Sequence, residues 1–360
     1  MFVSKLNLHN FRNYREQTID FTSGTNIICG NNANGKTNIL EAIYLFAYGK
    51  SYRCKTDSEM IKFGEEFASV SIDFETNQRE YKALMKLSLG GKKSISVNNV
   101  PINKLSRLMT YFHAVLFSPE DLALVKGSPG GRRKFMDASL CRLYPKYFMA
   151  LAEYRKISNE KNILLRQLRK KGKTSDDYLS LWNERLSVPC ALIMEYRREY
   201  IKGISQFASV IQKEISDEEL KIDYEASFKS YDAEEIKEFL DQNQKREIES
   251  GAMCWGVQRD DISIDINGLD ARQFASQGQQ RTTALSMRIA EAEYIYHKTE
   301  EYPVLLLDDI FSELDLKRRM YLWQKIVDKQ VIITCTDTDS FDNINNARIL
   351  KCVQGTVSEA

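Results

Sequence analysis

Eight residues near the start of the chain, Gly30-Asn31-Asn32-Ala33-Asn34-Gly35-Lys36-Thr37, constrain its fold more than any other segment. They match the pattern G-x-x-x-x-G-K-[ST], in which backbone N–H groups of a glycine-rich loop surround phosphates at the start of a helix. The apolar run 25–29 before the loop predicts a buried strand, and the apolar spacing over 38–48 predicts a helix after it. Strand, loop and helix in this order predict an α/β core that binds a nucleotide.

Two side chains of this loop and two downstream acids have expected chemical roles. Lys36 is expected to reach the outer phosphates of ATP, and the Thr37 hydroxyl to hold Mg²⁺. The hydrophobic segment 304–309 ends in Asp308 and Asp309, which predicts carboxylates at the carboxyl edge of the same sheet. We expect Asp308 to complete the Mg²⁺ site and Asp309 to position or deprotonate the attacking water. The alternative for these acids is a solvated turn after a strand.

Bulk composition excludes several other classes of protein. No apolar run approaches the ~18 residues of a membrane-spanning helix, and the first residues do not form a secretory signal, so a cytoplasmic location is expected. The seven cysteines are scattered without a C-x-x-C pair and only three histidines occur, which disfavours disulfide frameworks and zinc sites. A net charge of +1 gives no overall attraction to nucleic acid, so any such binding depends on local clusters.

The pattern along the chain predicts an ATPase lobe, 1–117 and 256–360, that is interrupted by a mainly helical lobe, 118–255. Alternating segments in the first part predict an antiparallel β subdomain beside a mixed α/β sheet; they are 69–75, 81–88 and 94–97. Later segments predict further elements of these lobes: strands at 111–117, 262–266 and 330–334, and a short helix at 233–242.

Helical spacing over about 130–215 predicts an antiparallel, coiled-coil-like hairpin with a polar turn at 169–177. Each arm would have about 35 residues and be about 50 Å long. Pro189 is expected to kink the second arm. The alternative is that these helices belong to a globular bundle.

A second polar turn, Ser276-Gln277-Gly278-Gln279, precedes a helical pattern. Polar residues around a glycine at a helix N-terminus suit a phosphate group. Because Lys36 already serves the nucleotide of its own subunit, this second element indicates an ATP molecule shared between two subunits. Taken alone, the turn is also compatible with an ordinary helix cap.

The order of these motifs resembles a known group. Phosphate loop, inserted helical arm, S-x-G-Q turn and the segment 306–315 are similar to the ABC-type ATPases of the SMC-like group. Within that group, the chain resembles the RecF family of bacterial recombination mediators. The residues that carry this narrower resemblance are 8–14, 119–121, 127–129, 132–137 and 306–315.

The resemblance implies roles for further residues. Arg12 would approach the phosphates from the first strand, and Asp315 would lie near a dimer interface. Ser276, Gly278 and Gln279 would contact the γ-phosphate held by the other subunit.

The chain departs from the family pattern at three places. No Gln occurs in 118–121 to sense Mg²⁺, so the residue with that role is left open. Asp309 stands where relatives often carry the longer Glu, and no His occurs in 335–337 after the last buried strand. These last two departures indicate slow turnover and a switch.

The resemblance also implies partners: DNA bound without sequence preference, a homodimer formed with ATP, RecR and RecO, and through them RecA loading and SOS induction, with no membrane. Basic clusters support DNA contact in part, although each could be a solvated face. These clusters are 50–55, 132–134 and the arm residues Arg155, Lys156, Lys161, Arg166, Arg169, Lys170, Lys171 and Lys173.

Other classes of protein remain open at this point. One is the ATPase subunit of a transporter, which would need a membrane partner. Another is an SMC-like structural DNA clamp, which would need far longer coiled coils. A third is an ATPase-nuclease of phage defence, for whose nuclease domain no length remains.

Overall fold

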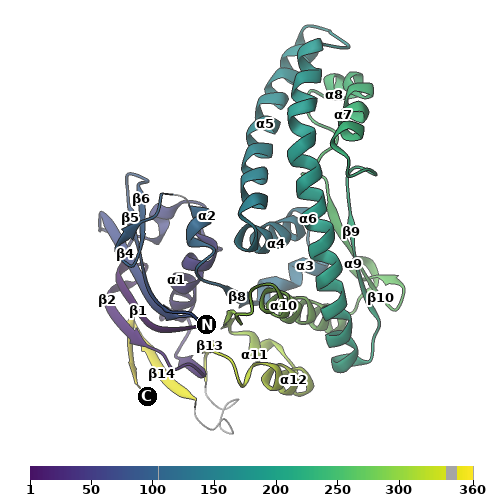
Figure 1. The fold of residues 1–360 in the computed structure, drawn as a ribbon. Helices are drawn as coiled ribbons and strands as arrows, with labels where there is room; N and C mark the ends of the chain where they lie inside the picture. Colours follow the sequence, from purple (N-terminus) through teal and green to yellow (C-terminus); the bar gives the residue numbers. More distant parts are fainter. Residues whose placement is uncertain (104, 338–346, 360) are drawn as a thin grey trace. The chain divides into compact units, whose positions relative to one another are not determined.

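The computed structural model describes residues 1–103, 105–337 and 347–359 (Figure 1). These form two compact units. The first comprises Met1–Leu122, Val210–Asp217 and Gln277–Ala360, and the second comprises Ala123–Ser209 and Glu218–Ser276. No helix in the described part of the chain is both long and apolar enough to cross a membrane.

The core of the first unit is a mostly parallel sheet with the strand order β15-β14-β3-β13-β12-β8. Its parallel strands are β3 (Thr25–Cys29), β8 (Ala114–Phe117), β12 (Val304–Asp308), β13 (Val331–Cys335) and β14 (Arg348–Val353); β15 (Thr356–Glu359) pairs antiparallel with β14. The central strands are almost entirely buried, which explains their continuous apolar sequences. The strands expected at 25–29, 304–308 and 330–334 are therefore confirmed within one residue.

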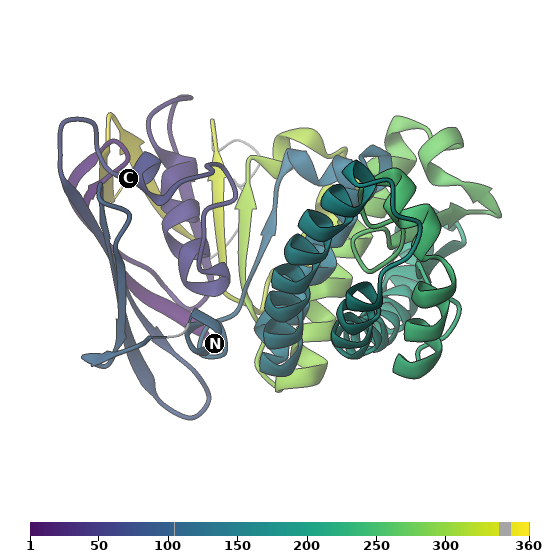
Figure 2. The same ribbon diagram turned by 90° about the horizontal axis from the view of Figure 1, so that it is seen from above.

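A second, antiparallel sheet of this unit has the order β2-β1-β4-β5-β6-β7. Its strands are β1 (Phe2–Phe11), β2 (Tyr14–Asp20), β4 (Phe67–Glu75), β5 (Glu80–Ser88), β6 (Lys93–Val97) and β7 (Val100–Pro101). The turn after β6 is a tight hairpin in which Asn98 and Asn99 have φ values of 49° and 63°, as a type I′ turn requires. Helix α1 (Lys36–Tyr48) lies between this sheet and the core sheet (Figure 2).

The remaining helices of the first unit follow the strands of the core sheet. They are α2 (Leu105–Leu108), α10 (Gln277–Thr299), α11 (Ile310–Glu313) and α12 (Leu316–Ile326), with short 3-10 turns at Asp57–Met60 and Pro119–Asp121. Helix α10 packs against β8, the edge strand of the core sheet. The mixed α/β fold expected from the sequence is confirmed.

The second unit is mainly helical. Helix α3 (Leu122–Lys126) leads into α4 (Pro129–Leu143), α5 (Pro145–Lys170) and α6 (Asp177–Ser216). Helices α5 and α6 run antiparallel, with the polar turn between them (Figure 1). Beside them lie α7 (Ala233–Gln242), α8 (Gln244–Ser250) and α9 (Ala271–Phe274), and a sheet with the order β11-β10-β9. Its strands are β9 (Leu220–Glu225), β10 (Asp261–Ile266) and β11 (Leu269–Asp270).

The hairpin is confirmed, but its arms differ from the expected lengths. The first arm breaks at Tyr144, which has an extended backbone (φ −131°, ψ 100°) because the following Pro145 disfavours a helical conformation before it. Helix α5 therefore has only 26 residues, whereas α6 has 40. Helix α6 continues through Pro189 as a single helix.

The unit boundaries also differ from those expected at 118 and 255. Strand β10 pairs with β9 and so brings 256–276 into the helical unit. The last turns of α6 belong to the first unit, where Ser286 on α10 donates a hydrogen bond to Gln212 at 3.0 Å.

The helical unit contains a buried arginine between two acids. Arg197 on α6 is 1% exposed and donates hydrogen bonds to Asp137 (2.8 Å) and Asp260 (2.7 Å). Further donors of the same guanidinium reach the Tyr147 hydroxyl at 3.1 Å and the Val257 carbonyl at 2.7 Å. A buried charge of this kind is tolerated only when it is paired and hydrogen-bonded. These contacts tie α4, α6 and the segment before β10 together.

Candidate nucleotide-binding site

The phosphate loop between β3 and α1 has a backbone that only glycine can adopt at two positions. Gly30 has a φ of 154°, and a Cβ there would lie 2.2 Å from the Cys352 carbonyl oxygen. Gly35 has a φ of 107°, and its Cβ would lie 2.5 Å from the amide nitrogen of Asn13. The two glycines of the motif are thus required by sterics on both sides of the loop.

Neighbouring strands hold the loop in place. The Asn13 side chain donates to the Asn34 carbonyl at 3.0 Å, and the Gly355 N–H donates to the same oxygen at 3.1 Å. The Asn34 side chain in turn donates to the Cys352 carbonyl at 3.1 Å. The Lys36 ammonium lies over the loop, where it donates to the carbonyls of Gly30 (2.5 Å) and Asn31 (3.0 Å).

Thr37 and Asp308 meet beside the loop. The Thr37 hydroxyl donates to Asp308 Oδ1 at 2.9 Å, and the Thr334 hydroxyl donates to the same oxygen at 2.8 Å. A hydroxyl and a carboxylate are oxygen ligands of the kind that Mg²⁺ prefers, so this pair fits a magnesium ion. The described residues contain no cluster of three or more His, Cys, Asp and Glu side chains suited to another metal.

Asp309 is the N-cap residue of α11 and has a left-handed backbone (φ 52°), which turns the chain sharply at the carboxyl end of β12. Its N–H donates to the carbonyl and the hydroxyl of Thr334, at 3.2 and 3.1 Å. Burial raises the pKa of the Asp309 carboxyl, while Ser312 and Lys36 lower that pKa and Asp308 raises it. A carboxylate with an increased proton affinity beside the phosphate loop can accept a proton from water.

Thr334 is a residue that we did not single out from the sequence. It pairs with Asp308 in the register of β12 and β13, and its hydroxyl donates to the Asp308 carboxylate and accepts from the backbone N–H of Asp309. The sequence does contain a sign of this role, because Thr334 is the polar residue near the end of the apolar strand β13. Its proximity to Asp308 follows only from the strand order.

Replacing Thr334 by Val is expected to weaken Mg²⁺ binding, because Asp308 loses the hydrogen bond that orients its carboxylate. Loss of such an outer contact typically costs 10- to 100-fold in metal affinity. The measurement is a Mg²⁺ titration of the binding of a fluorescent ATP analogue. Thr334→Ser, which keeps the hydroxyl, is the matched control and should behave like the wild type. Equal Mg²⁺ requirements in all three proteins would contradict this role.

Arg12 is held beside α1. Its guanidinium makes two hydrogen bonds to Glu41, at 2.9 and 2.6 Å, and a third to the Glu59 carbonyl at 2.8 Å. The Glu41 side chain is fully buried. Arg12 is therefore fixed by α1, the helix that follows the phosphate loop, and its expected contact with phosphates stays a prediction.

The turn at the start of α10 and the turn before α12 are joined by Arg318. Its guanidinium donates to the Gly278 carbonyl at 3.0 Å and to the Thr282 hydroxyl at 2.7 Å, and it pairs with Asp315. Asp315 also caps α12 by accepting from the Arg318 N–H at 3.0 Å. The sequence expectation named Gly278 and Asp315 but not the arginine that brings them together.

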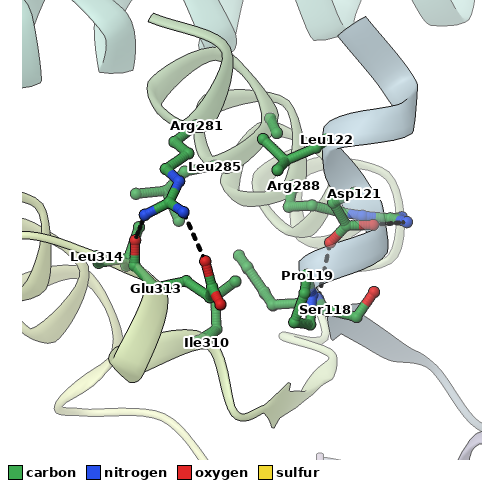
Figure 3. Close-up of a pocket in the computed structure, with 12 residues that line it drawn as sticks. Ser118, Pro119, Asp121, Leu122, Arg281, Leu285, Arg288, Ile310, Glu313 and Leu314 are labelled. Atoms are coloured by element: carbon green, nitrogen blue, oxygen red, sulfur yellow. Dashed lines mark hydrogen bonds and ion pairs between the residues drawn. The ribbon is translucent and has the colours of Figure 1, made fainter. Parts of the chain in front are cut away.

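The segment Ser118–Asp121 has a partner on α10. Asp121 forms an ion pair with Arg288 at 2.6 Å and accepts from the Ser118 N–H at 2.9 Å (Figure 3). Across an apolar pocket, Arg281 of α10 pairs with Glu313 of α11 at 2.6 Å. Two ion pairs thus connect α10 to the segments that follow β8 and β12. In the segment where relatives carry a Mg²⁺-sensing Gln, Asp121 therefore forms an ion pair with α10.

Phosphate loop, paired carboxylate strand and a polar turn before α10 define a P-loop ATPase core of the ABC type. A family model described as the RecF/RecN/SMC N-terminal domain matches residues 2–359. Two solved SMC head domains share the fold at a TM-score of 0.58, with 18% and 16% identity over the whole of this chain and 96% and 97% of theirs.

Closer similarity is found to RecF proteins. The chain is 40% identical to the DNA replication and repair protein RecF of Acetivibrio thermocellus over 96% of both chains. It is 38% identical to that of Clostridium acetobutylicum over the full length of both. A solved structure of the recombination mediator RecF with ATP in the RecFOR pathway superposes with a TM-score of 0.92 at 33% identity, covering 100% of this chain and 97% of that chain. The chain belongs to the RecF family.

Proposed function

We propose that this protein is an ATP-dependent DNA-binding switch of recombinational repair in the cytoplasm. ATP and Mg²⁺ bind at Lys36, Thr37 and Asp308. The Ser276–Gln279 turn of a second copy closes over the γ-phosphate, and the resulting dimer clamps DNA. Slow hydrolysis releases the DNA. In this role the protein acts with RecO and RecR at single-strand gaps, supports the loading of RecA and contributes to SOS induction.

The strand order of the core sheet carries this proposal. The phosphate loop follows β3, whereas Arg281 and Arg318 join the start of α10 to the segment after β12, two strands further along the sheet. At about 4.8 Å per strand this separation is roughly 10 Å. The γ-phosphate of an ATP molecule bound at Lys36 is therefore contacted by the α10 turn of a second copy rather than by the α10 turn of the same chain. The RecF relative solved with ATP supports the choice of nucleotide.

The residues of the site divide the chemistry between them. Lys36 and the loop amides bind and orient the triphosphate. Asp309 holds the attacking water and accepts its proton, helped by the pKa that burial raises. The Mg²⁺ ion, when bound, offsets the negative charge of the phosphate oxygens. The shorter reach of Asp309 compared with Glu, together with the absence of a His in 335–337, favours slow turnover.

Light scattering with and without ATP tests the dimer. We expect ATP to double the mass of the wild type, but not of Lys36→Met, which loses phosphate contacts, or Ser276→Arg, which blocks the turn. Ser175→Arg, in the exposed turn of the hairpin, is the matched control and should dimerise normally. The proposal is wrong if ATP leaves the wild type monomeric, or if the Lys36 and Ser276 variants dimerise as it does.

A further inference from the structure

The helical unit contains a pocket whose charged lining residues are mainly basic. It lies between one face of α4, one face of α5 and the segment before β10. Arg133, Lys134 and Asp137 come from α4, Arg155 from α5 and Arg197 from α6. Four of these five charged residues are cations. The spacing of Arg133, Lys134 and Asp137 places them on one helix face.

The single acid among these five residues is already neutralised. Asp137 accepts hydrogen bonds from Tyr147 at 2.5 Å and from the buried Arg197 at 2.8 Å, and Arg155 approaches it at 3.3 Å. The Arg197 charge is likewise shared with Asp260 below the pocket. Arg155 and Arg197 together offset the charges of Asp137 and Asp260, so the positive charges of Arg133 and Lys134 remain to attract anions.

The cations of the pocket differ in how they are held. The Arg133 guanidinium is fixed, because it donates to the Asp260 carbonyl at 2.7 Å, and the residue is partly buried. Lys134 is exposed, and the Arg155 side chain is 64% exposed. Arg132, the neighbour of Arg133, is instead buried and makes two hydrogen bonds to Asp261 at 2.7 Å. One member of the 132–134 cluster is therefore structural and the other two face the pocket.

We propose that this pocket binds the phosphodiester backbone of a nucleic acid, with Arg133, Lys134 and Arg155 as the phosphate contacts. The inference rests on the proposed DNA-binding function and assigns to it a site on the helical unit. The pocket is open at its rim, whereas small-molecule sites bury most of their ligand. Its cations Lys134 and Arg155 are exposed, and exposed cations can contact phosphates without any preference for base sequence.

The test is the salt dependence of DNA binding, measured by fluorescence anisotropy with a labelled duplex that contains a single-strand gap, in the presence of ATP. In the double variant Lys134→Ala/Arg155→Ala, the slope of log K against log salt should fall by about 0.9 for each lost phosphate contact. Binding near 0.1 M salt should weaken roughly tenfold per contact, and this difference should shrink as salt rises. Lys202→Ala, another exposed lysine of the helical unit, should leave the slope unchanged.

Control measurements on the wild type and the double variant distinguish a failure of the pocket inference from a failure of the proposed function. Thermal unfolding and ATP-dependent dimerisation of the double variant should match the wild type, because both removed side chains are largely exposed. If the wild type does not bind DNA with ATP, the proposed function fails. If the wild type binds and the double variant has the same slope, only the pocket inference fails. Stabilisation by inorganic phosphate that is lost in the double variant, with DNA binding unchanged, would assign the pocket to a free anion and overturn the nucleic-acid proposal.

Discussion

ATP hydrolysis by the Asp309→Asn variant is expected to fall by about 10²- to 10⁴-fold, the contribution of a positioned general base. Asn keeps the size of the side chain but cannot accept the proton of the attacking water. Lys36, Thr37 and Asp308 are untouched, so ATP binding and ATP-driven dimerisation should persist. The measurements are phosphate release under single-turnover conditions and light scattering on the same samples. Normal hydrolysis by this variant would exclude Asp309 as the base.

The pH dependence of hydrolysis offers an independent check on Asp309. Burial raises the pKa of its carboxyl above the ordinary value, so the reactive, deprotonated form is lost as pH falls through that raised pKa. Hydrolysis by the wild type should therefore rise with pH across this window, and the residual activity of Asp309→Asn should not. Asp309→Glu is the matched control: it restores the carboxylate with one more methylene, and we expect its turnover to exceed that of the wild type.

The nucleotide site was largely predictable because its parts are encoded by local sequence. The loop from Gly30 to Thr37 and the acids after β12 each follow a buried strand, and carboxyl ends of parallel strands meet at one sheet edge. The structure brings Thr37 and Asp308 to 2.9 Å, as that reasoning predicts. Thr334 and Arg318 were missed because their roles depend on which strand or helix lies beside them. No local sequence pattern shows which strand or helix will pack beside these residues.

The basic clusters show that sequence alone also fails to tell which charged residues are buried. Lys161 was expected to be available for DNA, but its side chain is fully buried and pairs with Glu247 at 2.7 Å. Burial lowers the pKa of Lys161, and Glu247 opposes that shift. Its spacing on α5 agrees with this burial, since Tyr154, Ile157, Leu165 and Leu168 of the same face are also buried. A charged residue within an apolar stripe is thus better interpreted as a buried ion pair than as a surface contact.

The break at Tyr144 was also encoded in the sequence. The apolar spacing continues from Leu140 through Tyr144 to Leu151, so periodicity alone predicts one helix. Pro145 decides otherwise, because it restricts the backbone of the residue before it. Local stereochemistry overrides periodicity where the two disagree. As a result α4, which carries Arg133 and Lys134, is a helix separate from α5.

Replacing Arg197 by Met is expected to lower the free energy of unfolding of the helical unit by about 3–5 kcal/mol. Met retains much of the apolar volume of the side chain but leaves Asp137 and Asp260 without their shared cation. Urea unfolding, combined with hydrogen exchange of the α6 amides, measures the loss in this unit. The matched control is Arg198→Met, whose side chain is 47% exposed and pairs with Glu199 at the surface; it should change stability by less than about 1 kcal/mol.

The pH dependence of this loss distinguishes an unpaired charge from a packing defect. Burial raises the pKa of Asp260 even in the wild type, where Arg197 opposes the shift, so removing Arg197 should raise that pKa further. A carboxyl whose pKa is higher in the folded than in the unfolded state is destabilising above its folded pKa and neutral below its unfolded pKa. The destabilisation of Arg197→Met should therefore grow as pH rises through that window and shrink towards acid. Adding Asp260→Asn removes one unpaired charge and should recover part of the loss at neutral pH. A loss that is independent of pH, and not relieved by Asp260→Asn, would mean that packing rather than charge sets the role of Arg197.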